Sequence, residues 1–342
     1  MTGDAPVIVD VLTGFLGAGK TSLVRRLAEA GALSGVAVLV NEYAAPPVDQ
    51  SLMGLSGLKA GTFADGCLCC ATDGDLRASL LQLLENRAGG KVRPFTRILI
   101  ETSGIADPAS LLATLVSDPM LRPRLRLGRV VTLVDLCHAP TTLAEQQEAV
   151  AQIVAADIVL FTKADMADEG AVELACAVVG AINPIAALRE CSPHDNTDPF
   201  DLHALQPRHR KAPVASAVHT HHHHIASTVL RWPSPVDWAV FASWLSLLLH
   251  RHGPNILRMK GIMTIAGEEQ HGPVVIQSVR HIVHMPEHVA QPAANGGAEI
   301  VVIAREIDPA LIRRSFETFL AHAERKNRST EDHLPQINAV IA

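Results

Sequence analysis

The chain has 342 residues, of which 48% are hydrophobic and 19% charged, and its formal net charge at pH 7 is −6. This is the composition of a globular protein, and the length suits one large domain with a smaller one. No block of Lys or Arg stands out, so nucleic acid or an anionic membrane would gain little counterion-release energy by binding here. The first residues, MTGDAPVIVD, lack the basic region of a signal peptide, and the longest apolar run, WAVFASWLSLLL, is too short to cross a bilayer. We therefore expect a cytoplasmic protein with neither a nucleic-acid nor a membrane partner.

Short apolar runs alternate with amphipathic stretches through the first half of the chain. The runs that predict strands are residues 6–14, 35–43, 96–104, 128–135 and 157–165. Helices are expected over 20–31 and 73–90 and in the segments between the later strands. Strands that alternate with helices predict a parallel sheet with helices on both faces, so the first domain, residues 1–191, is expected to be α/β.

The composition changes near residue 192. Residues 192–224 are rich in Pro, His and polar side chains without an apolar period, which is typical of a linker. The pattern resumes as a strand, a helix, three strands and a helix, with Asp308 as a plausible N-cap of the last one. The ranges are 225–232, 235–253, 255–267, 273–284, 298–306 and 308–324. This order predicts a smaller C-terminal α+β domain over 225–325, with its helices on one face of the sheet, followed by a tail over 326–342.

The segment GFLGAGKT follows the first predicted strand and opens the first predicted helix. It fits the pattern G-x-x-x-x-G-K-[ST], in which glycines let the backbone wrap a phosphate at a helix N-terminus. Lys20 is expected to reach the β- and γ-phosphates, and the Thr21 hydroxyl to bind Mg²⁺. The candidate nucleotide-binding residues here are Gly14, Gly17, Ala18, Gly19, Lys20, Thr21 and Ser22. The sequence therefore predicts a P-loop NTPase sheet.

A P-loop site also needs an acidic residue at a strand end to hold Mg²⁺. RILIETSG supplies Glu101 after a buried strand, and the amide of Gly104 could sense the γ-phosphate. We predict Glu101, with Lys20 and Thr21, as the catalytic residues. Asp135, which ends VVTLVD, is a weaker candidate for the same neighbourhood.

The segment FTKAD follows a later strand and is expected to select the base. It is close to the guanine-reading pattern [NT]-K-x-D, in which the Asp carboxylate accepts two hydrogen bonds that adenine cannot offer. The Lys stem covers the plane of the base. Thr162, Lys163 and Asp165 therefore predict GTP rather than ATP.

Three of the six cysteines lie together in GCLCC, a Gly-containing turn: Cys67, Cys69 and Cys70. Thiolates suit Zn²⁺ best and Co²⁺ or Ni²⁺ less selectively, and an incomplete ligand shell suits delivery. A redox site and a piece of core are the alternatives, but no C-x-x-C opens a helix and the turn has little apolar context. We interpret the cluster as a metal site, and Cys137, Cys176 and Cys191 as small core residues.

Eight of the 17 histidines fall between His194 and His224. The densest group comprises His219, His221, His222, His223 and His224. Such a tract binds transition metals, so a low-affinity loading loop is favoured over a solvated linker.

Taken together, GFLGAGKT, VNEY, GCLCC, ETSG and FTKAD resemble the CobW-type P-loop GTPases, a family of metallochaperones. The order of the motifs is that of the family, and ILRMKGIM and IVVIAREID resemble its C-terminal domain, so the resemblance covers residues 6–320. Tyr43 stands where the family has Phe, and Thr162 where it has Asn. The resemblance implies that Glu42 lies near the cysteines as a further ligand.

We therefore expect a GTP-hydrolysing metallochaperone that uses Mg²⁺, carries Zn²⁺ or Co²⁺ at Cys67, Cys69 and Cys70, and delivers it to a client metalloprotein. A homodimer is one assembly consistent with this expectation. A P-loop small-molecule kinase, which needs neither TKAD nor the cysteines, and a metal storage or sensing protein without turnover are the alternatives.

Overall fold

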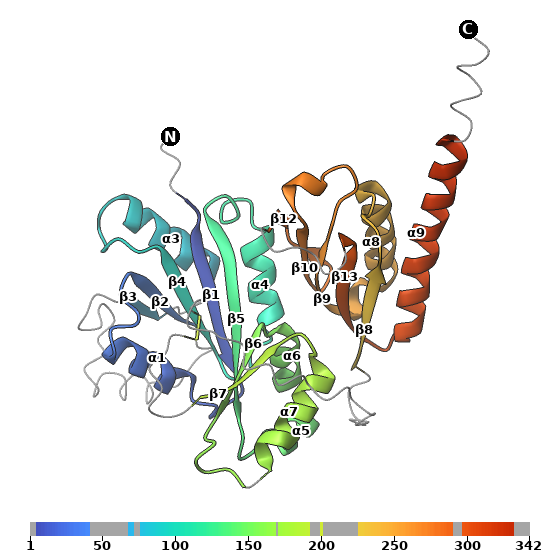
Figure 1. Ribbon diagram of the computed structural model, residues 1–342. Coiled ribbons are helices and arrows are strands. Elements are labelled where there is room, and N and C mark those ends of the chain that lie inside the picture. The colour runs from blue at the N-terminus through green and yellow to red at the C-terminus, as the bar shows by residue number, and fades with distance from the viewer. Residues whose placement is uncertain are drawn as a thin grey trace, which may run out of the picture. The chain divides into compact units, whose positions relative to one another are not determined.

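The computed structural model describes residues 5–41, 68–71, 76–168, 170–191, 199–200, 225–289 and 296–331 (Figure 1). The chain divides into two compact units, residues 1–222 and 223–342. The three boundaries between the four segments expected from the sequence remain a prediction. In the part of the chain that is described, no helix combines the length and the apolar character needed to cross a membrane.

The first unit is built on a parallel sheet of seven strands in the order β3-β2-β4-β1-β5-β6-β7. The strands are β1 (Val7–Gly14), β2 (Val36–Asn41), β3 (Leu68–Ala71), β4 (Arg97–Thr102), β5 (Leu125–Asp135), β6 (Ile158–Thr162) and β7 (Ala187–Glu190). The helices are α1 (Lys20–Glu29), α3 (Leu76–Ala88), α4 (Pro108–Ser117), α5 (Ala139–Glu145), α6 (Gln147–Ala155) and α7 (Ala171–Ile182).

Helices pack on both faces of this sheet (Figure 1). On one face, Val24 and Leu27 of α1 pack against strand residues such as Val38 and Leu99. On the other, α4 and α6 pack against β5 and β1. Strand residues point alternately to the two faces, and both are apolar, so the strands are continuous buried runs. The predicted α/β class is confirmed.

The second unit is an antiparallel sheet in the order β11-β10-β9-β13-β8, with β12 paired to β10. Its strands are β8 (Ile225–Trp232), β9 (Ile256–Met263), β10 (Val274–Val279), β11 (Ile282–Val283), β12 (Glu287–His288) and β13 (Ala298–Arg305). Its helices are α8 (Trp238–His252) and α9 (Pro309–Glu331), with short 3₁₀ turns at Gly253–Asn255 and Glu269–His271.

Both long helices contribute to one core in this unit. Trp244 of α8 meets Phe316 of α9 edge to face, with ring centroids 5.0 Å apart, and its indole N–H donates to the Ser315 hydroxyl at 3.1 Å. Ile300 and Val302 of β13 belong to the same cluster. The predicted α+β domain is confirmed.

Three elements differ from the sequence prediction. The single strand expected over 273–284 is wrong, because the chain turns at Arg280, whose φ is 52°, and returns as β11. The helix expected to end at 324 continues to Glu331, within the predicted tail. GCLCC was interpreted as a turn, but residues 68–71 pair with β2 as the edge strand β3.

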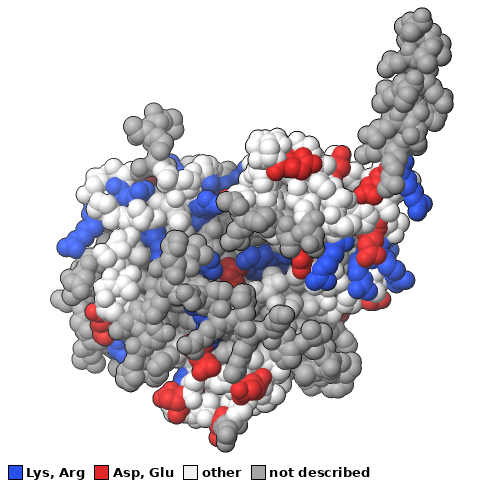
Figure 2. Space-filling view, in the orientation of Figure 1, with Lys and Arg blue, Asp and Glu red and all other residues white. Residues whose placement is uncertain are grey.

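The face of the molecule seen in Figure 2 carries both acidic and basic side chains. This distribution fits the modest net charge of −6.

Candidate nucleotide-binding site

The turn between β1 and α1 has the backbone of a phosphate-binding loop. Gly17 and Gly19 lie in the left-handed region, at φ 75° and 95°, where a residue with a side chain would be strained. A Cβ on Gly14 would lie 2.5 Å from the carbonyl oxygen of Leu133, so only glycine allows β1 to pass β5 this closely. No side chain caps α1 at Gly19, which leaves its N-terminal amides facing an incoming anion.

Lys20 is folded back over this loop. Its side chain is only 9% exposed, and its Nζ donates to the carbonyl oxygens of Gly14 at 2.7 Å and Phe15 at 3.3 Å. The loop carbonyls thereby hold the ammonium group beside the N-terminus of α1. A positive charge held there suits a phosphate ligand.

Thr21 and Glu101 meet although they are 80 residues apart in sequence. The Thr21 hydroxyl donates to Glu101 Oε1 at 2.6 Å. Glu101 is 2% exposed, at the carboxyl end of β4, while Thr21 is exposed in the first turn of α1. A hydroxyl and a carboxylate side by side next to a phosphate loop are hard oxygen donors of the kind that Mg²⁺ prefers. The two residues predicted to hold Mg²⁺ therefore lie together.

The loop that follows β4 packs directly on the phosphate loop. A Cβ on Gly104 would lie 2.8 Å from the backbone nitrogen of Leu16, so this contact requires glycine. Before it, the Thr102 hydroxyl donates to the Thr13 hydroxyl at 2.8 Å, which joins β4 to β1 in the core. Gly104 lies next to the phosphate loop, as its predicted role requires.

The segment predicted to read the base, residues 161–165, is hydrogen-bonded to the same loop. The Thr162 hydroxyl donates to the carbonyl oxygen of Ala18 at 3.0 Å. Lys163 has a φ of 58°, an uncommon backbone conformation for a residue with a side chain, and its Nζ donates to Asp135 at 2.7 Å. Asp165 is exposed.

Asp135 binds Lys163 and His138 at the end of β5. Burial raises the pKa of its carboxyl group, but hydrogen bonds from Lys163, His138 and the Cys137 amide outweigh burial, so the net pKa lies below the ordinary value of 3.8. The carboxylate is therefore charged at neutral pH and pairs with the Lys163 ammonium. Asp135 therefore contacts the lysine that the sequence predicts to cover the base, whereas the sequence had suggested it for the Mg²⁺ neighbourhood.

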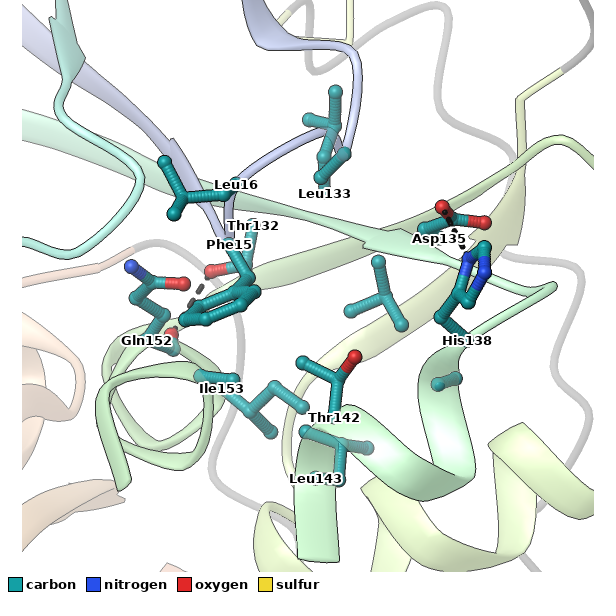
Figure 3. A pocket seen from close by; sticks show the side chains of 14 residues that line it. Phe15, Leu16, Thr132, Leu133, Asp135, His138, Thr142, Leu143, Gln152 and Ile153 are labelled. Carbon is teal, nitrogen blue, oxygen red and sulfur yellow. Dashed lines mark hydrogen bonds and ion pairs between the residues drawn. The ribbon is translucent and has the colours of Figure 1, made fainter. Parts of the chain in front are cut away.

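A cavity of about 170 Å³ lies on the α5 and α6 side of the phosphate loop (Figure 3). Phe15 and Leu16 of the loop line it, together with the end of β5 and residues of α5 and α6. Most of its wall is apolar, but Thr132 and Gln152 also reach it. Figure 3 shows the carboxamide of Gln152 beside the Phe15 ring.

The predicted transition-metal ligands lie mostly outside the described residues. These are Glu42, Cys67 and the histidines at 219 and 221–224. Cys69 and Cys70 belong to β3, in register with Val38 and Leu39 of β2.

Of the other three cysteines, Cys137 departs most clearly from the interpretation as a core residue. Cys137 is exposed, so its interpretation as a core residue is wrong, because its turn after β5 lies at the surface. Cys176 and Cys191 are half-buried.

Sequence reasoning missed Gln152. It is fully buried on α6, and its side chain contacts the loop after β4. One signal was available, since Gln152 is a polar residue between the buried apolar residues Val150 and Ile153 of one helix.

Comparison with known proteins shows which family the chain belongs to. A model of the CobW/HypB/UreG nucleotide-binding domain matches residues 8–189, and one of the cobalamin synthesis protein cobW C-terminal domain matches residues 225–320. The zinc chaperone YjiA of Escherichia coli is 33% identical over 272 residues, covering 77% of this chain and 83% of that protein. The zinc chaperone CobW of Pseudomonas aeruginosa is 28% identical and covers 93% of this chain and 92% of that one.

A solved structure agrees along nearly the whole chain. The crystal structure of Zn(II)-bound YjiA GTPase from E. coli aligns with a TM-score of 0.71 at 26% identity, covering 92% of this chain and 99% of that chain. The resemblance stated from the motifs and the predicted GTPase class are both confirmed. The chain belongs to the CobW/HypB/UreG family of GTPases and carries the CobW C-terminal domain.

Proposed function

We propose that this protein is a GTP-hydrolysing metallochaperone that binds Zn²⁺ at Cys67, Cys69 and Cys70 and transfers it to a client metalloprotein. The observation that carries the nucleotide part is the 2.6 Å contact between Thr21 and Glu101 beside the phosphate loop. The metal part is supported by the zinc chaperones among its relatives and by the thiolate cluster.

The chain's own residues account for the charge chemistry of hydrolysis. In that reaction a water oxygen attacks the γ-phosphorus and the bond to the β–γ bridging oxygen breaks, giving GDP and phosphate. Lys20 and the N-terminal amides of α1 counter the negative charge on the phosphates. Thr21 and Glu101 would hold Mg²⁺, which when bound neutralises charge on the β- and γ-phosphate oxygens.

Guanine selection is assigned to the segment after β6. Asp165 is exposed and available to accept hydrogen bonds from the base, while Lys163 is held by Asp135. Thr162 takes the place of the usual Asn, and its hydroxyl joins this segment to Ala18 of the phosphate loop. Thr162 therefore supplies a hydrogen bond between the base-selecting and phosphate-binding segments.

The strand register connects the cysteine segment to the nucleotide site. Ala71 of β3 is in register with Val40 of β2, which in turn is in register with Glu101 of β4. Two strand spacings separate Ala71 from Glu101, about 10 Å. The proposed Mg²⁺ ligand Glu101 is thus two strands away from the cysteine segment. At this distance, a structural change at the Mg²⁺ position can alter a metal site on this edge of the sheet.

Zn²⁺ is proposed as the cargo ahead of Co²⁺ because thiolates suit zinc best and because relatives are named zinc chaperones. A reducing compartment such as the cytoplasm keeps the three thiols available for metal. Glu42 and the histidines at 219 and 221–224 are proposed as additional ligands, the histidines for low-affinity loading.

The experiment measures zinc stoichiometry and nucleotide hydrolysis on the same preparations. We expect one tightly bound Zn²⁺ per chain, lost in the triple variant Cys67→Ser, Cys69→Ser, Cys70→Ser, and hydrolysis of GTP well above ATP. The matched control replaces the other three cysteines, Cys137, Cys176 and Cys191, by Ser and should retain the tight zinc. Equal stoichiometry in the two triple variants would contradict the cysteine site. A phosphorylated small molecule as product would favour a kinase, and zinc binding without GTP turnover would favour storage or sensing.

A further inference from the structure

Gln152 of α6 donates both hydrogens of its side-chain amide to the loop that follows β4. Its Nε2 lies 3.0 Å from the carbonyl oxygen of Gly104 and 3.1 Å from that of Ala106. The side chain is fully buried. A buried carboxamide that donates both of its hydrogens to one loop fixes the position of that loop.

The surroundings fix the orientation of this carboxamide. Exchanging its oxygen and nitrogen would place the oxygen against two carbonyl oxygens, so the contacts decide the assignment. Thr132 of β5, only 1% exposed, donates from its hydroxyl to the backbone carbonyl of Gln152 at 2.9 Å (Figure 3). The residue is therefore held by the sheet through its backbone and holds the loop through its side chain.

The loop held by Gln152 contains the glycine assigned to the γ-phosphate. Gly104 packs against Leu16 of the phosphate loop, and a Cβ on Gly104 would lie 2.8 Å from the Leu16 nitrogen. Glycine has the freest backbone of all residues, so a loop turning on Gly104 needs an outside constraint to keep its amide in place. The two hydrogen bonds act on the C-terminal side of Gly104 and supply such a constraint, in addition to the turn in which the Ala106 amide donates to the carbonyl oxygen of Ser103 at 3.2 Å.

We propose that Gln152 is a positioning residue for GTP: it holds the Gly104–Ala106 segment where the Gly104 amide meets the γ-phosphate, without touching the nucleotide itself. This inference rests on the proposed GTPase site. It implies that loss of the carboxamide weakens recognition of the γ-phosphate specifically, because GDP has no group at that position.

Asn183 provides a matched comparison. It is also a buried carboxamide, 1% exposed, and its Nδ2 donates to the carbonyl oxygens of Ile153, Val154 and Ala156 at the C-terminal end of α6, directly after Gln152. Those contacts close the end of a helix and do not involve the phosphate loop. An Asn183 variant should therefore lose stability without changing nucleotide discrimination.

The test compares Gln152→Met, which keeps the length of the side chain but has no donor, with Asn183→Leu and with Gln147→Met at an exposed position of α6. For each protein we would measure Kd for GDP and for a slowly hydrolysed GTP analogue, kcat and KM for GTP, and the midpoint of urea unfolding. In Gln152→Met we expect the affinity for the GTP analogue to fall about 10-fold relative to that for GDP, and kcat to fall as well. Both controls should keep the wild-type ratio of affinities.

Equal loss of GDP and GTP-analogue affinity in Gln152→Met, or the same change of ratio in Asn183→Leu, would overturn the proposal. If Gln152→Met does not fold, Gln152→Asn keeps the carboxamide but shortens its reach, and the same ratio decides. Wild-type protein that neither prefers guanine nucleotides nor hydrolyses GTP would instead overturn the proposed function. The two failures are thereby distinguishable.

Discussion

The hydroxyl of Thr21 donates a 2.6 Å hydrogen bond to Glu101, which joins the first turn of α1 to the carboxyl end of β4. Because β4 lies next to β1, the topology brings the residue after the phosphate loop to the acidic end of the neighbouring strand. A hydroxyl beside a buried carboxylate offers the hard oxygen donors that Mg²⁺ prefers, which supports the proposed Mg²⁺ role of these two residues.

Replacing Glu101 by Gln should abolish most of the GTPase activity. The amide keeps the shape of the side chain but removes the charge, so kcat should fall about 100-fold or more, while GDP affinity changes less. The measurement is steady-state hydrolysis over a Mg²⁺ titration, with Glu85→Gln on the exposed face of α3 as control. An unchanged Mg²⁺ dependence in the Glu101 variant would show that this carboxylate has no part in the site.

Replacing Thr162 by Val removes the hydroxyl that reaches Ala18 while preserving the side-chain shape. The affinity for GTP and GDP should fall about fivefold, because one hydrogen bond contributes about 1 kcal/mol. Thr162→Asn, the residue usual in this family, should bind at least as well as the wild type. Isothermal titration calorimetry checks both variants, and a Val variant with wild-type affinity would argue against the tie.

Asp165→Asn should shift base preference from guanine towards xanthine. Xanthine has a carbonyl where guanine has its amino group, so an amide donor replaces the carboxylate acceptor as the matching partner. Competition of GTP and XTP for the two proteins measures the shift. If Asp165→Asn binds GTP as the wild type does, another residue reads the base.

Asp135 should make stability depend on pH in acid. Burial raises the pKa of its carboxyl group, but the hydrogen bonds from Lys163, His138 and the Cys137 amide lower it by more, so the pKa in the folded protein lies below 3.8. A group whose pKa is lower in the folded than in the unfolded protein stabilises the fold when the pH is above its unfolded pKa. This stabilisation is lost as the pH falls through the folded pKa.

Asp135→Asn should therefore lower the free energy of unfolding by about 1 kcal/mol from pH 7 to pH 5, since bonds to a charged group are lost. The difference between the two proteins should shrink below about pH 4. Urea unfolding at a series of pH values measures it, and a difference that grows in acid would contradict the assignment.

All three tryptophans, Trp232, Trp238 and Trp244, lie in the C-terminal unit, so their fluorescence reports its unfolding. Phe316→Ala removes the fully buried ring that packs on Trp244 and should destabilise this unit by about 3 to 5 kcal/mol. Leu311→Ala, at a residue 55% exposed on the same helix, should change stability by no more than about 0.5 kcal/mol. Similar unfolding midpoints for the two variants would contradict the core described for this unit.

The parts of the site that depend on a short, continuous segment of the chain could be predicted from the sequence. A Gly-rich turn between an apolar strand and a helix specifies its own backbone, so Gly17, Gly19 and Lys20 could be assigned before the fold was known. The proximity of Glu101 to Thr21 also followed, because strand ends of a parallel sheet meet at one edge.

The remainder depends on tertiary contacts that leave weak traces in sequence. Residues 68–71 are too few to show a strand period, and they form β3 only by pairing with β2. The turn at Arg280 contains no Gly, so nothing local marked the break between β10 and β11. Gln152 resembled an ordinary interruption of an apolar face, and its meaning came from a loop 46 to 48 residues away.

In the proposed function, the nucleotide state controls the affinity of the metal site. The most direct test measures the Kd for Zn²⁺ in the presence of a slowly hydrolysed GTP analogue with Mg²⁺ and in the presence of GDP with Mg²⁺. We expect at least a 10-fold difference in Kd between the two states and a matching effect of Zn²⁺ on nucleotide affinity. Both effects should be lost when Cys67, Cys69 and Cys70 are replaced by Ser. Equal zinc affinity in the two nucleotide states would contradict it.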